Sequence, residues 1–240
     1  MRAIRIQSAS QWASAERLHR EVAARPLAPA PGMALVSSPP ASAVDRRGRV
    51  WLALDGDVAA GTIRASYGAD GDLAEHLNPY GLAPILDVVG AARIVVYDRF
   101  EVLPRYRSSL AALLLMKVAA EDTLRRGIDI AVYACEPDSV SYYESLGFRC
   151  YRPPHARPNH EKPVPLLLVY SDRAHLAAVD SPIRRRIPAR IPTGIDPGLA
   201  RLLDDATQRH RCRRHVPVAR SHAGTVTDRI SDGLSAWWRG

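Results

Sequence analysis

A positively charged residue stands directly before a run of residues that is expected to open a helix. Arg107 follows a strand-like stretch that stops at Pro104, and small or apolar residues come after it. The first amide groups of a helix have no partner within the helix, so its amino end attracts anions, and an adjacent guanidinium adds to that attraction. The sequence therefore predicts a phosphate-binding site here. Its residues are Arg107, Ser108, Ser109, Leu110, Ala111 and Ala112.

The elements that must position this site follow from the pattern of apolar residues. Residues 94–102 are rich in β-branched and aromatic side chains and predict a strand that ends before Pro104. From residue 108 the apolar residues recur with helical spacing, which predicts a helix of about 19 residues that stops at Gly127. Residues 128–135 predict a second strand, which is parallel to the first because a long helix connects them. Residues 137–147 predict a short helix.

The remaining chain can be assigned more coarsely. A first strand is expected around residues 4–6 and a helix at 11–24, followed by a Pro-rich loop to about Asp45. Residues 50–66 predict a hairpin, since Asp55-Gly56-Asp57 is a strong turn signal. Residues 67–90 stay ambiguous between a short helix and a loop.

Taken together, these motifs resemble the GNAT superfamily of N-acyltransferases. The pattern of that superfamily is a strand, a proline, then Arg or Gln-x-x-Gly-x-Gly/Ala at a helix start, and later Tyr-x-x-x-Gly-Phe. Arg107 matches the first position, Ala112 the last small position, and Tyr143 with Gly147-Phe148 the closing element. Leu110 departs from the pattern, because it stands where the first glycine lets a phosphate approach the backbone.

Further segments look most like the N-acyl amino acid synthase branch, whose members take long acyl chains from acyl carrier protein. The likeness covers residues 45–183. The segments that carry it are Arg-x-Ser-x-x-Ala from Arg107, Cys135-Glu136-Pro137, Tyr143-Glu144-x-Leu146-Gly147-Phe148, Val164-Pro165-Leu166-x-Leu168, Asp172-x-x-His175-Leu176 and Ser181-Pro182.

The resemblance implies an α/β (α+β) GNAT fold, with a mixed central sheet, splayed parallel strands and flanking helices. It implies acyl transfer from a phosphopantetheine thioester, on acyl-CoA or acyl carrier protein, to the amine of an amino acid or small molecule. The backbone of Val102 and Leu103 would pair with the pantetheine arm, and amides 108–112 with Arg107 would hold its phosphate. Tyr143 is the candidate acid that protonates the departing thiolate. No metal is expected.

The general base has several candidates. Glu101 is our first choice, and strand alternation places it on the opposite face from Phe100. Asp98, Glu136 and His160 are rivals, while His155, in the same Pro-rich loop as His160, is more typical of a loop histidine.

Charge divides the chain into two parts. Residues 184–240 contain twelve Arg and no Lys against five Asp and no Glu, or +7 of the total of +8. We therefore expect a GNAT-like acyltransferase domain at 1–183 and a basic Arg/Pro-rich extension at 184–240, partly helical or disordered, with a helix at about 198–209. The extension is either a solvated tail or a docking site for an acidic partner, with acyl carrier protein favoured over anionic lipid and nucleic acid.

Composition favours a cytoplasmic enzyme. No window of about 18 apolar residues predicts a membrane span, and residues 1–6 lack the apolar core of a secretory signal. The three cysteines show no redox spacing, and arginines interleave His210-x-Cys212-x-x-His215, which argues against a metal there. Two other functions stay open: an ordinary acetyl-CoA-dependent GNAT N-acetyltransferase, and a non-catalytic module that binds acyl thioesters.

Overall fold

A mixed β-sheet forms the centre of the computed structural model, which describes residues 1–23, 48–106, 109–152 and 163–204. In this part of the chain the sheet has seven strands in the order β1-β2-β3-β4-β5-β7-β6. Only β4 and β5 run parallel, and the other neighbours are antiparallel. The strands are β1 (Arg2–Arg5), β2 (Arg49–Asp55), β3 (Val58–Tyr67), β4 (Ile94–Val102), β5 (Ile130–Cys135), β6 (Arg149–Cys150) and β7 (Val164–Val169).

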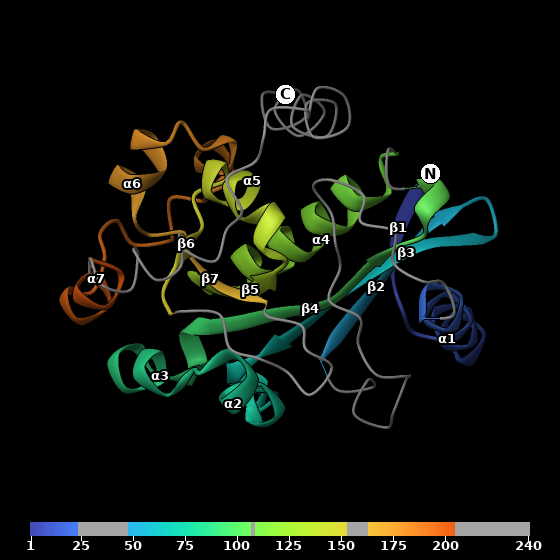
Figure 1. Ribbon diagram of the computed structural model, residues 1–240, viewed down its shortest axis with the longest axis horizontal. Coiled ribbons are helices and arrows are strands. Elements are labelled where there is room, and N and C mark those ends of the chain that lie inside the picture. Colours follow the sequence, from blue (N-terminus) through green and yellow to red (C-terminus); the bar gives the residue numbers. More distant parts are fainter. Residues whose placement is uncertain (24–47, 107–108, 153–162, 205–240) are drawn as a thin grey trace.

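Helices cover both faces of this sheet. The helices are α1 (Ala9–Ala23), α2 (Leu77–Tyr80), α3 (Ala83–Val89), α4 (Ala111–Arg125), α5 (Val140–Ser145), α6 (Arg173–Ala178) and α7 (Pro197–Asp204). In Figure 1, α4 and α5 lie above the sheet, and α1, α2 and α3 lie below it. Short 3-10 turns connect them at Gly68–Asp70, Ala74–His76, Ala91–Arg93, Pro104–Tyr106, Pro137–Ser139 and Pro182–Arg186. No helix in the described ranges is long and apolar enough to cross a bilayer.

The two parallel strands diverge at the centre of the sheet. Strand β4 pairs with β5 only through Ile94↔Ile130, Val95↔Ala131 and Val96↔Val132. Beyond these residues β4 continues to Val102 along β3, and β5 continues to Cys135 along β7. This confirms the expected splay of the parallel strands.

A β-bulge interrupts β4 just past the point of divergence. Residues Thr62 and Arg64 of β3 lie two apart, whereas their partners Glu101 and Asp98 lie three apart. The extra residue is Arg99, whose φ of 44° is uncommon for a side chain other than glycine. The bulge shifts the alternation by one position, so Asp98 and Glu101 share the face that carries α1.

Most predicted elements are confirmed. The strand at 94–102, the hairpin, the parallel crossover and the short helix before Gly147 all form. Gly147 has φ 101°, and a Cβ there would lie 2.3 Å from the Leu176 side chain, which explains why the helix stops at a glycine.

The start of α4 corrects one prediction. The helix begins at Ala111 rather than at 108 and has 15 residues rather than about 19. The Ser109 amide donates to the Tyr106 carbonyl at 2.9 Å, and the Ser109 hydroxyl accepts from the Ala111 amide at 3.2 Å. Serine favours such local side-chain bonds over the helical ones, so the helix begins only after Ser109.

Residues 184–204, assigned from the sequence to the basic extension, contribute to the packed structure. Ile187 and Ile191 are buried in the cluster under α4, and Leu199 and Leu203 in the cluster between α7 and the sheet. Helix α7 begins where the helix at 198–209 was expected, and residues 205–240 lie outside the described ranges. We therefore restrict the hypothesis of a basic docking extension to residues 205–240.

Candidate active site

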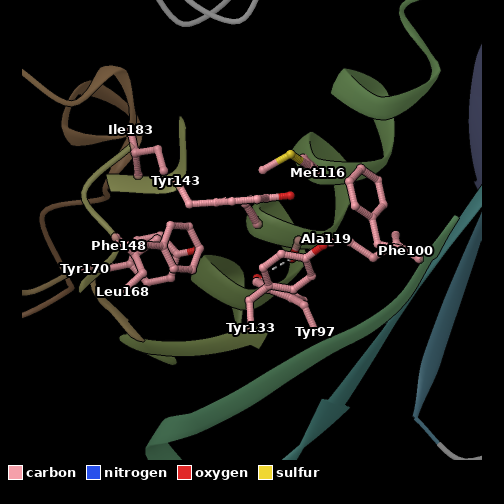
Figure 2. A pocket seen from close by; sticks show the side chains of 12 residues that line it. Tyr97, Phe100, Met116, Ala119, Tyr133, Tyr143, Phe148, Leu168, Tyr170 and Ile183 are labelled. Atoms are coloured by element: carbon pink, nitrogen blue, oxygen red, sulfur yellow. Dashed lines mark hydrogen bonds between the residues drawn. The ribbon is translucent and has the colours of Figure 1, made fainter. Parts of the chain in front are cut away.

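An apolar pocket lies where β4 and β5 diverge, on the face covered by α4 and α5 (Figure 2). Its volume is about 40 Å³. The walls are almost entirely hydrocarbon and aromatic ring. The lining residues are Ile63, Tyr97, Phe100, Met116, Ala119, Ala120, Tyr133, Tyr143, Phe148, Leu168, Tyr170 and Ile183.

Local structure explains why these side chains converge. Tyr97 and Phe100 lie three positions apart in β4, and the bulge at Arg99 places both on the pocket side. On α4, Met116 and Ala119 share one helical face, and the small alanine leaves room between helix and sheet. The pocket therefore depends on the bulge and on small residues in α4, neither of which the sequence analysis used.

Tyr143 reaches across this pocket from α5 toward Met116 and Phe100 (Figure 2). It is buried, and its ring centroid lies 4.9 Å from that of Tyr133 and 5.6 Å from that of Phe148. Burial raises the pKa of Tyr143 well above 10, and the neighbouring Tyr133 and Cys135 raise it further. The hydroxyl is therefore protonated at neutral pH and is able to donate a proton inside the pocket.

Glu101 lies on the other face of the same strand, as alternation predicted. Its carboxylate is buried, and its Oε2 lies 2.5 Å from Nδ1 of His19 in α1. The sequence analysis missed His19. No local signal could have revealed it, because 82 positions separate it from Glu101.

The rival base Asp98 forms an ion pair with Arg64. Arg64 donates from Nε to Asp98 Oδ1 at 2.7 Å, also contacts the second oxygen, and reaches Glu75 Oε1 at 2.8 Å. The guanidinium therefore engages both carboxylate oxygens of Asp98 in hydrogen bonds. Glu136 is half-buried at the end of β5, and His155 and His160 lie outside the described residues.

Glu75, His76 and Asp98 are residue types that bind metals, but Arg64 occupies the space between them. His76 Nε2 lies 3.4 Å from Glu75 Oε1 and 3.9 Å from Asp98 Oδ2. Arg64 bonds these very oxygens, so a second cation would meet its positive charge. Within the described residues we therefore assign no metal.

The expected donor-binding residues surround the start of α4. Ala111 and Ala112 are buried in its first turn, Leu110 is 60% exposed just before it, and the Ser109 hydroxyl accepts from the Ala111 amide. Arg107 and Ser108 lie outside the described ranges, so their roles stay predictions.

The backbone at the end of β4 offers one clear pairing position. The Leu103 amide donates to the Ala60 carbonyl of β3 at 2.9 Å and is not available to a ligand. Alternation along the strand turns the amide and carbonyl of Val102 to the opposite edge, where β5 has diverged. Of the two residues predicted to pair with the pantetheine arm, Val102 is therefore the better placed.

Comparisons with known proteins address the fold. No protein-family model and no curated protein matches the chain. A solved structure from Lactobacillus plantarum, provisionally described as an N-acetyltransferase, is similar with a TM-score of 0.50 at 17% identity, and the match covers 70% of this chain and 97% of that one.

Two further structures match slightly less well. FeeM, an N-acyl amino acid synthase from uncultured soil microbes, has a TM-score of 0.49 at 16% identity, with 74% of this chain and 96% of that chain covered. An acyl-CoA N-acyltransferase from Pseudomonas aeruginosa also has 0.49, at 12% identity, with 70% and 100% covered. Together with the splayed sheet, the match to the Lactobacillus structure shows that the chain has the GNAT fold, and at these identities the likeness concerns the fold alone.

Proposed function

We propose that the protein is a GNAT-type N-acyltransferase that moves an acyl group from a phosphopantetheine thioester to an amine. The observation that carries this proposal is the splay of β4 and β5, which opens onto an apolar pocket with a protonated tyrosine inside. The pantetheine arm would lie along the free edge at Val102, with its phosphate at Arg107 and the first turn of α4.

The chemistry needs two proton-handling groups on opposite sides of the thioester. A deprotonated amine attacks the thioester carbonyl, so that a carbon–nitrogen bond forms and the carbon–sulfur bond breaks. Tyr143 donates its proton to the leaving sulfur from the pocket side. A base on the opposite face of β4, where Glu101 lies, receives the proton that the amine loses. Backbone amides of β4 would stabilise the oxyanion.

The apolar walls favour a fatty acyl group and hence an N-acyl amino acid synthase-like activity. Burial of each methylene contributes about 0.8 kcal/mol, which polar walls would not offer. Acyl carrier protein or acyl-CoA would deliver the group as a co-substrate, with a small-molecule amine as acceptor. The volume of about 40 Å³ supports a second candidate, a short-chain or acetyl-CoA-dependent enzyme, because a long chain requires lining side chains to move.

One experiment tests the proposed function directly. The protein is incubated with acyl-CoA and acyl-carrier-protein donors from two to sixteen carbons and with pooled amino acids, and products are detected by mass spectrometry. We expect N-acyl products that require the protein and both substrates. Binding of donors without any product would instead identify a non-catalytic thioester-binding module.

The donor phosphate site yields a further prediction. Arg107→Ala should weaken coenzyme A binding by about 1.5–3 kcal/mol, the range for a charge-assisted hydrogen bond, while the melting temperature stays nearly unchanged. Arg105→Ala is the matched control, since Arg105 is exposed and paired with Glu21 at 2.8 Å. Isothermal calorimetry showing equal affinities for both variants would remove Arg107 from the site.

The basic segment 205–240 is expected to raise the reaction rate with only one kind of donor, the acyl carrier protein. If it steers an acidic carrier protein, its deletion should slow reaction with acyl carrier protein but not with acyl-CoA. Initial rates with the intact chain at about 0.05 and 0.5 M salt, where the Debye length falls from roughly 14 to 4 Å, should show the same selectivity. Equal effects on both donors would contradict docking by this segment.

A further inference from the structure

A buried pair joins α1 to the end of β4 on the face opposite the pocket. The side chain of Glu101 retains 4% of its surface and that of His19 retains 10%. Their contact, from His19 Nδ1 to Glu101 Oε2, is 2.5 Å long. Both side chains are largely buried, and the imidazole is the more exposed of the two.

The position of the pair matters because Glu101 directly precedes Val102. Val102 carries the free backbone edge at the splay, and Phe100, on the other side of Glu101 in the chain, lines the apolar pocket. An acyl carbon held at this edge would have Tyr143 on one side of the strand and the His19–Glu101 pair on the other.

The order of the two groups suggests which one takes the proton. An imidazole that donates its Nδ1 proton to a buried carboxylate is held in one tautomer, and its Nε2 keeps a lone pair. A neutral imidazole with a free Nε2 lone pair can accept a proton from a substrate amine. A carboxylate behind it orients the ring and stabilises the imidazolium that forms.

We propose that His19 is the catalytic base and that Glu101 is its positioning residue. This inference rests on the proposed function and deepens it, since Glu101 itself was the first choice of base from the sequence. In the step, the nitrogen–hydrogen bond of the acceptor breaks and the proton moves to Nε2 of His19. The Nδ1 proton remains shared with Glu101, and the imidazolium later releases the Nε2 proton to water.

Chemical rescue distinguishes the two assignments. His19→Ala should lower turnover about 10²- to 10⁴-fold, the usual range for a general base. Added imidazole should restore part of that loss in proportion to its concentration, and formate should not. Glu101→Ala should lower turnover as well, without rescue by formate. Arg17→Ala, an exposed change on the same helix whose Nη2 contacts Ser14 Oγ at 2.9 Å, is the control for helix integrity.

Two outcomes would overturn the inference. One is rescue of Glu101→Ala by formate together with no rescue of His19→Ala by imidazole, which would make the carboxylate the base. The other needs no activity: nitrogen-15 NMR of the neutral His19 ring should show the proton on Nδ1, and a proton on Nε2 would contradict the proposal. If the wild-type protein acylates no amine, the proposed function fails, and the tautomer still tests the arrangement of the pair.

Discussion

Replacing Tyr143 with phenylalanine should lower kcat at least about 10²-fold, the scale for removal of a positioned proton donor. The ring, its packing on Tyr133 and Phe148, and therefore the affinity for the donor should stay nearly unchanged. Steady-state kinetics and calorimetry with the same donor measure the two quantities separately. A Tyr143→Phe enzyme as fast as wild type would make Tyr143 a purely structural residue.

The adjacent tyrosine provides a matched control. Tyr142→Phe removes a buried hydroxyl that has no hydrogen-bond partner in the described part of the chain, so turnover should not change. The pH profile adds a second check on Tyr143. Because its pKa lies well above 10, the hydroxyl stays protonated as pH rises, and Tyr143 should cause no loss of kcat below about pH 10.

Filling the pocket should have the next largest effect. Met116→Trp places a bulky ring at the edge of the cavity, where Met116 is only half-buried, and displaces acyl carbons from it. Excluding about three methylenes at about 0.8 kcal/mol each corresponds to a loss of roughly 60-fold in kcat/KM for long-chain donors. Acetyl donors should lose little, so the comparison of chain lengths is the measurement.

A second position on α4 controls for the bulk itself. Val118 is also partly buried against the core but does not line the pocket. Val118→Trp should therefore leave the preference for chain length as it is in wild type. The same shift in both variants would show that the apolar pocket does not hold the acyl chain.

Local signals account for the parts of the fold that were predictable. The strand at 94–102 was predicted to the residue, because its β-branched run ends before a proline that cannot pair in a sheet. The start of α4 was misplaced by three residues, because Ser109 forms local hydrogen bonds with Tyr106 and Ala111 in place of helical ones. The net charge assigned residues 184–204 to the basic extension, because it counts the arginines and ignores the apolar residues between them. Ile187 and Ile191 are nevertheless buried in the core.

The site was only partly predictable, because its contacts are long-range. The positions of Tyr143 and Glu101 follow from motif and alternation, and the structure places them on opposite sides of β4 as that pattern implies. His19 meets Glu101 only through the packing of α1 on the sheet. The bulge at Arg99 had no signal either, because neither glycine nor asparagine marks its positive φ.

That bulge has a consequence for how the protein could diversify. It brings Tyr97 and Phe100, three positions apart, to the pocket face of β4, and Asp98 and Glu101 to the face that carries α1. Substitutions on one face leave the side chains of the other face in place, so under the proposed function the preferences for acyl group and for amine would evolve independently. Loss of one residue from the bulge would exchange the two faces beyond it, and both preferences would be lost together.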